Sequence, residues 1–106
     1  MENDRSVTLF AGESMQFRLQ SRTSAGYQWF ARNERDSVVR VELAYDTSMV
    51  GSAAMSPDTV VTLTGLTPGR AEIVLEQKRA FETTIRRTVR TYVAVESAPA
   101  SHAKEP

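Results

Sequence analysis

The side chains that most often carry out catalysis are scarce in this 106-residue chain. Cysteine is absent, and the single histidine, His102, lies among the last residues. Without a cysteine or a well-placed histidine, the usual pairs of nucleophile and base cannot be built. Glu72 and Glu76 share one face of a predicted strand, where carboxylates mostly face solvent. No residues have the spacing of a metal site, so we expect no enzyme, metal or cofactor.

Three segments instead have the composition of binding loops. The first, residues 22–27, leads into the only tryptophan, Trp29, and the second, residues 50–55, consists mostly of small residues. The third, residues 78–82, contains an arginine and Phe81, which has no strand period to bury it. An exposed aromatic side chain beside an arginine is a common composition of binding hot spots. Equally, Phe81 could fold back onto the core.

Alternating apolar and polar residues predict the strands that position these segments. The alternation is strongest from Val39 to Tyr45, and no stretch has a helical period. Tyr27, Trp29 and Ala31 are predicted to share one face of their strand. We expect an all-β, immunoglobulin-like antiparallel β-sandwich of about seven strands, with a small barrel as the alternative. The predicted strands centre on residues 7–10, 15–19, 27–31, 39–45, 60–63, 71–76 and 89–95.

The connections between these strands differ in length and character. Residues 32–37 are charged, and residues 46–58 form a long stretch without a period, which is typical of functional loops. Residues 77–84 are interpreted as a polar link. We expect one domain over residues 1–96 and a disordered C-terminal tail over residues 97–106.

The overall charge argues against a polyanionic partner. Thirteen basic and thirteen acidic residues give a formal net charge of +0, so no global field recruits nucleic acid or a membrane surface. A local basic excess over residues 78–90 is interpreted as a solvated face, because no aromatic platform accompanies its arginines. An anion-binding patch is the alternative. The basic residues are Lys78, Arg79, Arg86, Arg87 and Arg90.

The compartment stays open. Residues 1–4 are acidic and polar, so we expect no signal peptide in this chain. An exported or periplasmic location would follow if a signal had been removed before Met1. No apolar run has the length of a membrane span, so we expect no membrane partner. The absence of cysteine is compatible with any redox compartment.

In this order, the three segments resemble the binding loops of the chagasin family of cysteine-peptidase inhibitors. The family's first loop reads Asn-Pro-Thr-Thr-Gly-aromatic-x-Trp, and Arg22-Thr23-Ser24-Ala25-Gly26-Tyr27-Gln28-Trp29 keeps the glycine, the aromatic residue and the tryptophan. Its second loop reads Gly-x-Gly-Gly, of which Gly51-Ser52-Ala53-Ala54 keeps the first glycine. Its third loop reads Arg-Pro-Trp or Arg-Pro-Phe, and Arg79-Ala80-Phe81 keeps the arginine and the aromatic residue. The resemblance covers most of residues 6–96.

The resemblance implies an immunoglobulin-like sandwich whose three loops lie at one end and wedge into the active-site cleft of a papain-like peptidase. The first loop would sit against the catalytic cysteine, and the other two would grip the cleft on either side. It implies a reversible, non-covalent inhibitor, which we expect to be a monomer. The peptidase-binding residues would be Thr23, Ser24, Ala25, Gly26 and Tyr27; Gly51, Ser52, Ala53 and Ala54; and Arg79, Ala80 and Phe81.

The chain departs from the family pattern inside the loops. Thr23 and Ala80 replace prolines, which removes two fixed φ angles. Ala53 and Ala54 replace glycines and disfavour positive φ, and Ala25 replaces a threonine. These departures leave an alternative open, in which a diverged immunoglobulin-like module uses the same loops to bind another protein and inhibits no peptidase.

Overall fold

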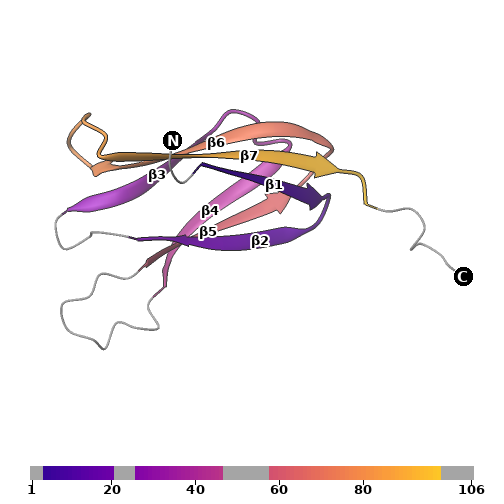
Figure 1. Ribbon diagram of the computed structural model, residues 1–106, viewed down its shortest axis with the longest axis horizontal. Coiled ribbons are helices and arrows are strands. Elements are labelled where there is room, and N and C mark those ends of the chain that lie inside the picture. Colours follow the sequence, from indigo (N-terminus) through magenta and orange to yellow (C-terminus); the bar gives the residue numbers. More distant parts are fainter. Residues whose placement is uncertain (1–3, 21–25, 47–57, 99–106) are drawn as a thin grey trace, which may run out of the picture.

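The computed structural model describes residues 4–20, 26–46 and 58–98, which form seven strands in two sheets (Figure 1). The strands are β1 Arg5–Phe10, β2 Ser14–Leu19, β3 Tyr27–Asn33, β4 Val39–Asp46, β5 Asp58–Gly65, β6 Gly69–Arg79 and β7 Arg87–Glu96. One sheet has four strands in the order β1-β7-β6-β3, and the other has three in the order β2-β5-β4. The described residues contain no helix that is long and apolar enough to cross a membrane.

This architecture confirms the predicted all-β, immunoglobulin-like sandwich. One pairing is parallel: β1 runs alongside β7, with Val7 opposite Val93. The other pairings of the described strands are antiparallel. The parallel pair is possible because the turn after β1 carries the chain into the other sheet instead of back along β1. Gly12 in that turn has a φ of 92°, a region that glycine adopts without strain.

The core lies between the two sheets and is built from the inward-facing residues of each strand. In β5 buried residues alternate regularly with half-buried ones, and in β6 they alternate with half-buried or exposed ones from Ala71 to Lys78. On β3 only Trp29 is buried, whereas Tyr27 is half-buried and Ala31 is exposed. The face of β3 that Tyr27, Trp29 and Ala31 were predicted to share is therefore exposed at Ala31. β3 lies at an edge of the larger sheet, where less of the strand is covered. The buried apolar residues are Leu9, Leu19, Trp29, Val38, Val39, Val61, Leu63, Ala71, Ile73, Leu75, Val89, Val93 and Val95.

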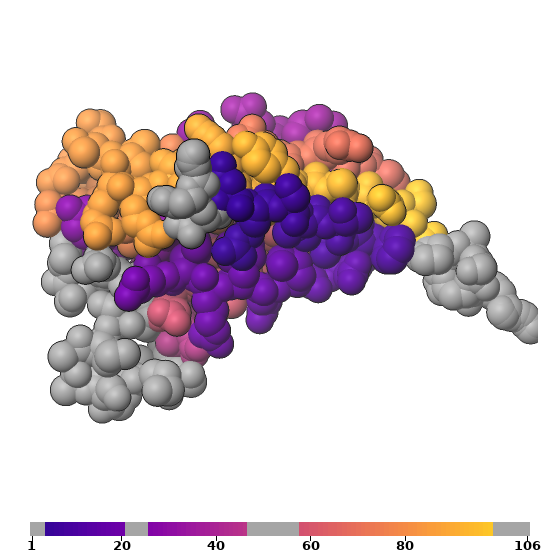
Figure 2. All heavy atoms as spheres, viewed as in Figure 1, coloured from indigo at the N-terminus to yellow at the C-terminus, as the bar shows by residue number. Residues whose placement is uncertain are grey.

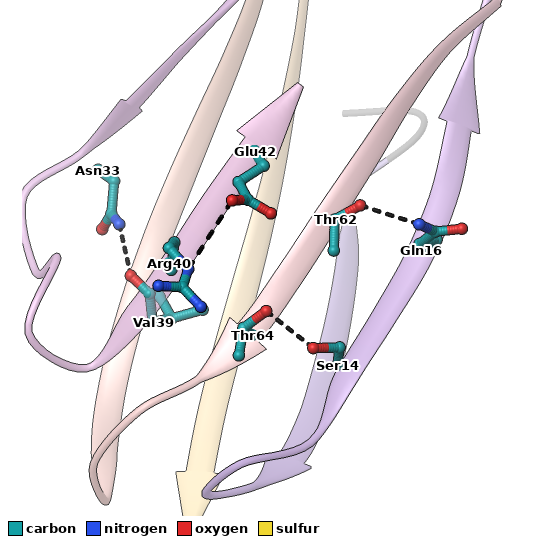
Figure 3. A network of polar contacts seen from close by, with 8 residues as sticks. All are labelled: Ser14, Gln16, Asn33, Val39, Arg40, Glu42, Thr62 and Thr64. Carbon is teal, nitrogen blue, oxygen red and sulfur yellow. Dashed lines mark hydrogen bonds and ion pairs between the residues drawn. The ribbon is translucent and has the colours of Figure 1, made fainter. Parts of the chain in front are cut away.

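Polar cross-strand pairs cover the outer face of the three-stranded sheet (Figure 3). The hydroxyl oxygens of Ser14 and Thr64 lie 2.8 Å apart, and Gln16 Nε2 donates to Thr62 Oγ1 at 3.1 Å. A register slip of one residue would move these polar side chains into the core, so they help to fix the pairing of β2 with β5.

The strand ends that flank the three predicted loop segments lie together. The end of β2, the start of β3, the end of β4, the start of β5 and the turn at residues 80–86 all lie at one end of the sandwich, on the left in Figure 1, which we call the loop end. The strand register determines which strand ends lie at the loop end, because the residues next to these segments are opposite one another on paired strands. These pairs are Leu19 with Thr59, Tyr27 with Arg79, Asp46 with Asp58, and Gln77 with Arg87. The turn that contains Gly12 lies at the opposite end, against Gly65.

The predicted C-terminal tail is described only at its start. Residues 97 and 98 are exposed and follow β7 without forming a further strand. Residues 99–106, including His102, lie outside the described residues, so the disordered tail and the domain boundary stay predictions.

Candidate functional site

The described residues of the predicted binding loops lie together at the loop end. They are Gly26 and Tyr27 from the first loop and Arg79, Ala80 and Phe81 from the third. The remaining predicted residues lie outside the described residues. These are Thr23, Ser24 and Ala25 of the first loop, and Gly51, Ser52, Ala53 and Ala54 of the second.

Arg79 joins the first loop to the third. It lies opposite Tyr27 in the pairing of β3 with β6, and its guanidinium carbon is 4.5 Å from the centre of the Tyr27 ring. Gly26 has a φ of 87°, which favours glycine. A Cβ atom built at Gly26 would lie 3.5 Å from Arg79 Nε, which is ordinary contact distance. The Arg79 side chain therefore packs along the backbone of Gly26 and over the ring of Tyr27.

The turn between β6 and β7 presents Phe81 to solvent. The Phe81 side chain is 101% exposed, so it does not fold back onto the core. Arg79 stabilises the turn, because its carbonyl accepts from the Glu82 backbone N–H at 3.1 Å and its Nη1 lies 3.5 Å from Glu82 Oε2. Ile85, which sequence analysis did not identify, adds a second exposed apolar side chain with 42% exposure. In the sequence, the one indication for Ile85 is that it is an apolar residue in an otherwise polar stretch.

A buried amide connects the bases of the same two loops. Gln77 is 0% exposed, and its Nε2 donates to the Gln20 carbonyl at 3.3 Å. Trp29 Nε1 donates to that carbonyl as well, at 3.0 Å. On its other side, Gln77 Oε1 accepts from Arg86 Nη1 at 2.7 Å. Gln20 precedes the first loop and Arg86 ends the third, so Gln77 links both.

The interpretation of residues 77–84 as a polar link is wrong at its start, because β6 continues to Arg79. Gln77 keeps the period of two that Ile73 and Leu75 begin, and all three are fully buried. The end of β6 was not predicted because Gln77, the third residue of this buried series, is polar. Its position two residues after Leu75 was the feature of the sequence that could have indicated a longer strand.

Arginine side chains also cover aromatic rings at the loop end. The guanidinium carbon of Arg86 lies 5.5 Å from the Tyr27 ring centre, and that of Arg87 lies 5.7 Å from the Trp29 ring centre. These arginines therefore have aromatic neighbours, but the cations cover the Tyr27 ring and Trp29 is buried, so neither ring is an open platform for stacking. Each contact of this kind contributes about 0.5–1 kcal/mol at an exposed site. Sequence analysis missed the contacts because they join different strands.

Glu72 and Glu76 form ion pairs on the outer face of the four-stranded sheet. Glu72 Oε2 lies 3.7 Å from Arg90 Nε, and Glu76 Oε2 lies 2.9 Å from Arg32 Nη2. A shallow cavity of about 830 Å³ covers part of this face and includes Arg32, Glu72 and Arg90 in its lining. Glu72, with a side chain 47% exposed, agrees with the interpretation of a solvated face, whereas the ion-paired Glu76 side chain is only 13% exposed. Among the described residues, no three acidic or histidine side chains are grouped to hold a metal ion.

The link through Gln77 predicts a pattern of unfolding free energies. Arg86→Ala leaves the buried Gln77 Oε1 without its partner and should lower the free energy of unfolding by about 1–3 kcal/mol. The same change in a Gln77→Leu background should cost less, because no buried acceptor is then left unpaired. Urea denaturation of the two single variants and the double variant measures the coupling. Arg70→Ala, at the exposed opposite end of β6, is the matched control, and equal losses from both arginines would contradict the link.

Comparisons with known proteins bear on the family and the fold. The family model described as "Chagasin family peptidase inhibitor I42" matches residues 8–95. The cysteine protease inhibitor EhICP2 from Entamoeba histolytica has a similar structure, with a TM-score of 0.70 and 17% identity over 90% of this chain and 89% of that chain. Amebosin is similar with a TM-score of 0.66 and 25% identity, over 86% of this chain and 88% of that chain.

Part of an S-layer protein also has a similar structure. Domains 4 and 5 of the S-layer protein SbsC match with a TM-score of 0.62 and 13% identity, over 90% of this chain and 49% of that chain. At such identities a structural match shows the fold alone. No curated protein sequence matches the chain.

The family match begins within β1 and ends within β7, so it takes in every strand of the sandwich. Members of this family are inhibitors of peptidases and not enzymes, in agreement with the lack of catalytic residues in the sequence. This chain therefore belongs to the chagasin family of peptidase inhibitors.

Proposed function

We propose that this chain is a monomeric, reversible, non-covalent inhibitor of papain-like cysteine peptidases. Family membership supports peptidase inhibition, and the similar structure of a cysteine protease inhibitor supports cysteine peptidases as the target class. The observation that carries the proposal is the packing of Arg79 against Gly26 and Tyr27. This contact joins residues of the first and third predicted loops, which supports a binding surface shared by the two.

In the proposed complex, the loop end enters the active-site cleft. Ser24, Ala25 and Gly26 would approach the catalytic cysteine, because small residues allow backbone to enter a narrow cleft. The second loop, Gly51 to Ala54, would line one wall, and Arg79, Ala80 and Phe81 would line the other. The chain has no cysteine, so it cannot form a disulfide with the catalytic thiol. Inhibition would therefore come from blocking the cleft.

Fixed loop bases support tight binding. A segment held at both ends loses less conformational entropy when it docks than a free segment does. The Gln20 carbonyl accepts from Trp29 and Gln77 on one side of residues 21–25, and Gly26 packs against Arg79 on the other. We propose that these contacts supply rigidity that the family obtains from the proline replaced here by Thr23.

A diverged interaction module is the alternative function. The S-layer domains show that this architecture occurs in a protein that is not described as an inhibitor, and a fold by itself does not determine function. Titration of papain and a cathepsin with the chain separates the two hypotheses. We expect one-to-one inhibition, reversible on dilution, with a nanomolar to micromolar inhibition constant. No inhibition at high micromolar concentration, together with a stable non-peptidase complex, would select the module.

Removal of the Phe81 side chain should weaken inhibition without affecting stability. Phe81→Ala is expected to raise the inhibition constant about 10- to 100-fold, because an exposed aromatic anchor often dominates an interface. Its melting temperature should equal that of the parent, since Phe81 is fully exposed. Phe10→Ala is the matched control: Phe10 is 40% exposed and lies at the opposite end. An inhibition constant that responds equally to both changes would refute the assignment of Phe81.

Replacing Gly12 and Gly26 by alanine, one at a time, should separate the effect of backbone strain on stability from the effect of the loop end on inhibition. Gly26 and Gly12 have similar φ angles of 87° and 92°, but they lie at opposite ends of the sandwich. Each glycine-to-alanine change should lower the free energy of unfolding by about 1–2 kcal/mol. Only Gly26→Ala should also raise the inhibition constant, because relief of its positive-φ strain shifts the backbone at the base of the first loop. The two proteins would be compared by urea denaturation and by peptidase titration, and parallel losses of inhibition would argue against the site.

A further inference from the structure

The β6–β7 turn and its flanks carry a local positive charge that the whole chain lacks. Residues 78–87 contain four cations, Lys78, Arg79, Arg86 and Arg87, and one carboxylate, Glu82, which gives a formal charge of +3 in a chain of net charge +0. Figure 2 shows this orange segment at the left extremity of the described molecule. The charge therefore projects from the loop end into solvent.

All four cations are held in place, and Arg79 pairs with the one carboxylate of this segment, Glu82. Arg79 and Arg86 lie over the same Tyr27 ring, at 4.5 and 5.5 Å, so their like charges repel. Arg86 is fixed further by the neutral amide of Gln77. Within the described part of the chain, no carboxylate forms an ion pair with Lys78, Arg86 or Arg87. An anionic partner would relieve this repulsion and would meet side chains that are already ordered.

The same surface has an apolar centre. Phe81 is 101% exposed and Ile85 is 42% exposed, and both lie in the turn between the cationic strand ends. Two large exposed apolar side chains surrounded by cations fit an apolar pocket whose rim carries carboxylates.

A nucleic acid fits this surface less well than a protein does. Binding of single strands requires open aromatic faces on which bases stack. At the loop end, Trp29 is buried and cations cover the ring of Tyr27. Two exposed rings lie at the described loop end, Phe81 and Tyr45, and Tyr45 lies on the other sheet, next to Asp46, which is paired with Asp58. The second ring is therefore beside carboxylates instead of the cations, and the chain as a whole is neutral.

We propose that the third-loop surface, defined as Lys78, Arg79, Phe81, Ile85 and Arg86, selects peptidases with an acidic rim around an apolar pocket beside the cleft. The inference rests on the proposed function and specifies the partner of that site. The acidic rim attracts the loop end during diffusion, and Phe81 then enters the pocket. Charge therefore acts mainly on the association rate constant, and the apolar contact acts on dissociation.

The test is the association rate constant with whichever of papain and a cathepsin the chain inhibits more tightly, measured by stopped flow. For the parent chain this constant should fall about tenfold between about 20 mM and about 300 mM salt. Arg86→Glu and Lys78→Glu should each lower it about tenfold at low salt and much less at high salt. Arg86→Lys, which keeps the charge, should stay within about twofold of the parent.

Arg70→Glu is the matched control, because it makes the same charge change at the opposite end of β6. It should alter the association rate constant less than about twofold. Circular dichroism shows whether Arg86→Glu is folded. If it is not, Lys78→Glu still tests the effect of charge, and the salt dependence of the parent chain tests it without any substitution.

The outcomes distinguish this inference from the proposed function. Inhibition whose association rate does not depend on salt, or which responds equally to Arg86→Glu, Lys78→Glu and Arg70→Glu, overturns the acidic partner and leaves the inhibitor standing. Failure of the parent chain to bind any peptidase of the panel overturns both. Displacement of the bound peptidase by a single-stranded oligonucleotide at low salt overturns the inference in favour of a polyanion.

Discussion

One buried amide sets the geometry of the loop end. Gln77 occupies a position where the strand period places side chains in the core, and an unpaired buried amide is costly. It is satisfied by the Gln20 carbonyl on one side and Arg86 on the other. These two residues belong to the bases of different loops. Displacement of either base leaves a buried polar group without its partner, so the two loops are stabilised as one unit.

The contacts of Arg86 and Arg79 extend this unit to the surface. Both guanidinium groups lie over Tyr27, and Arg79 also packs on the backbone of Gly26. The family sequence pattern has prolines inside its loops, whereas this chain has Thr23 and Ala80 at those positions. At the described loop bases, arginine, aromatic and amide side chains meet in the contacts that hold the strand ends together. The same arrangement leaves positive charge beside the exposed apolar tip.

The sequence was sufficient to predict the sandwich, because alternation of apolar and polar residues reports directly which strand face is buried. Turn residues then separated the strands. The parallel pairing of β1 with β7 depends on which sheet each strand joins, and alternation carries no information on that choice. Gln77 was assigned to a link because its polarity interrupts the pattern that its position continues.

At the candidate site, prediction from the sequence came closest where a property belongs to a single residue. Phe81 lacks a strand period and is exposed, as one of the two open hypotheses stated. Prediction failed for contacts between side chains on different strands, such as those of Arg86 with the Tyr27 ring and of Arg87 with the Trp29 ring. The family motifs directed attention to residues 79–81, but the neighbouring Ile85 and Arg86 have no counterpart in those motifs.

The central claim is that the loop end contacts a cysteine peptidase. Nuclear magnetic resonance of the labelled chain, titrated with a papain-like peptidase whose catalytic cysteine is replaced, tests it most directly. The account predicts changes in the backbone amide signals of Gly26, Tyr27 and residues 78–87, with the signals of Ser6, Arg70 and Tyr92 unchanged. Changes centred on those last three residues, on the outer face of the four-stranded sheet, would contradict it.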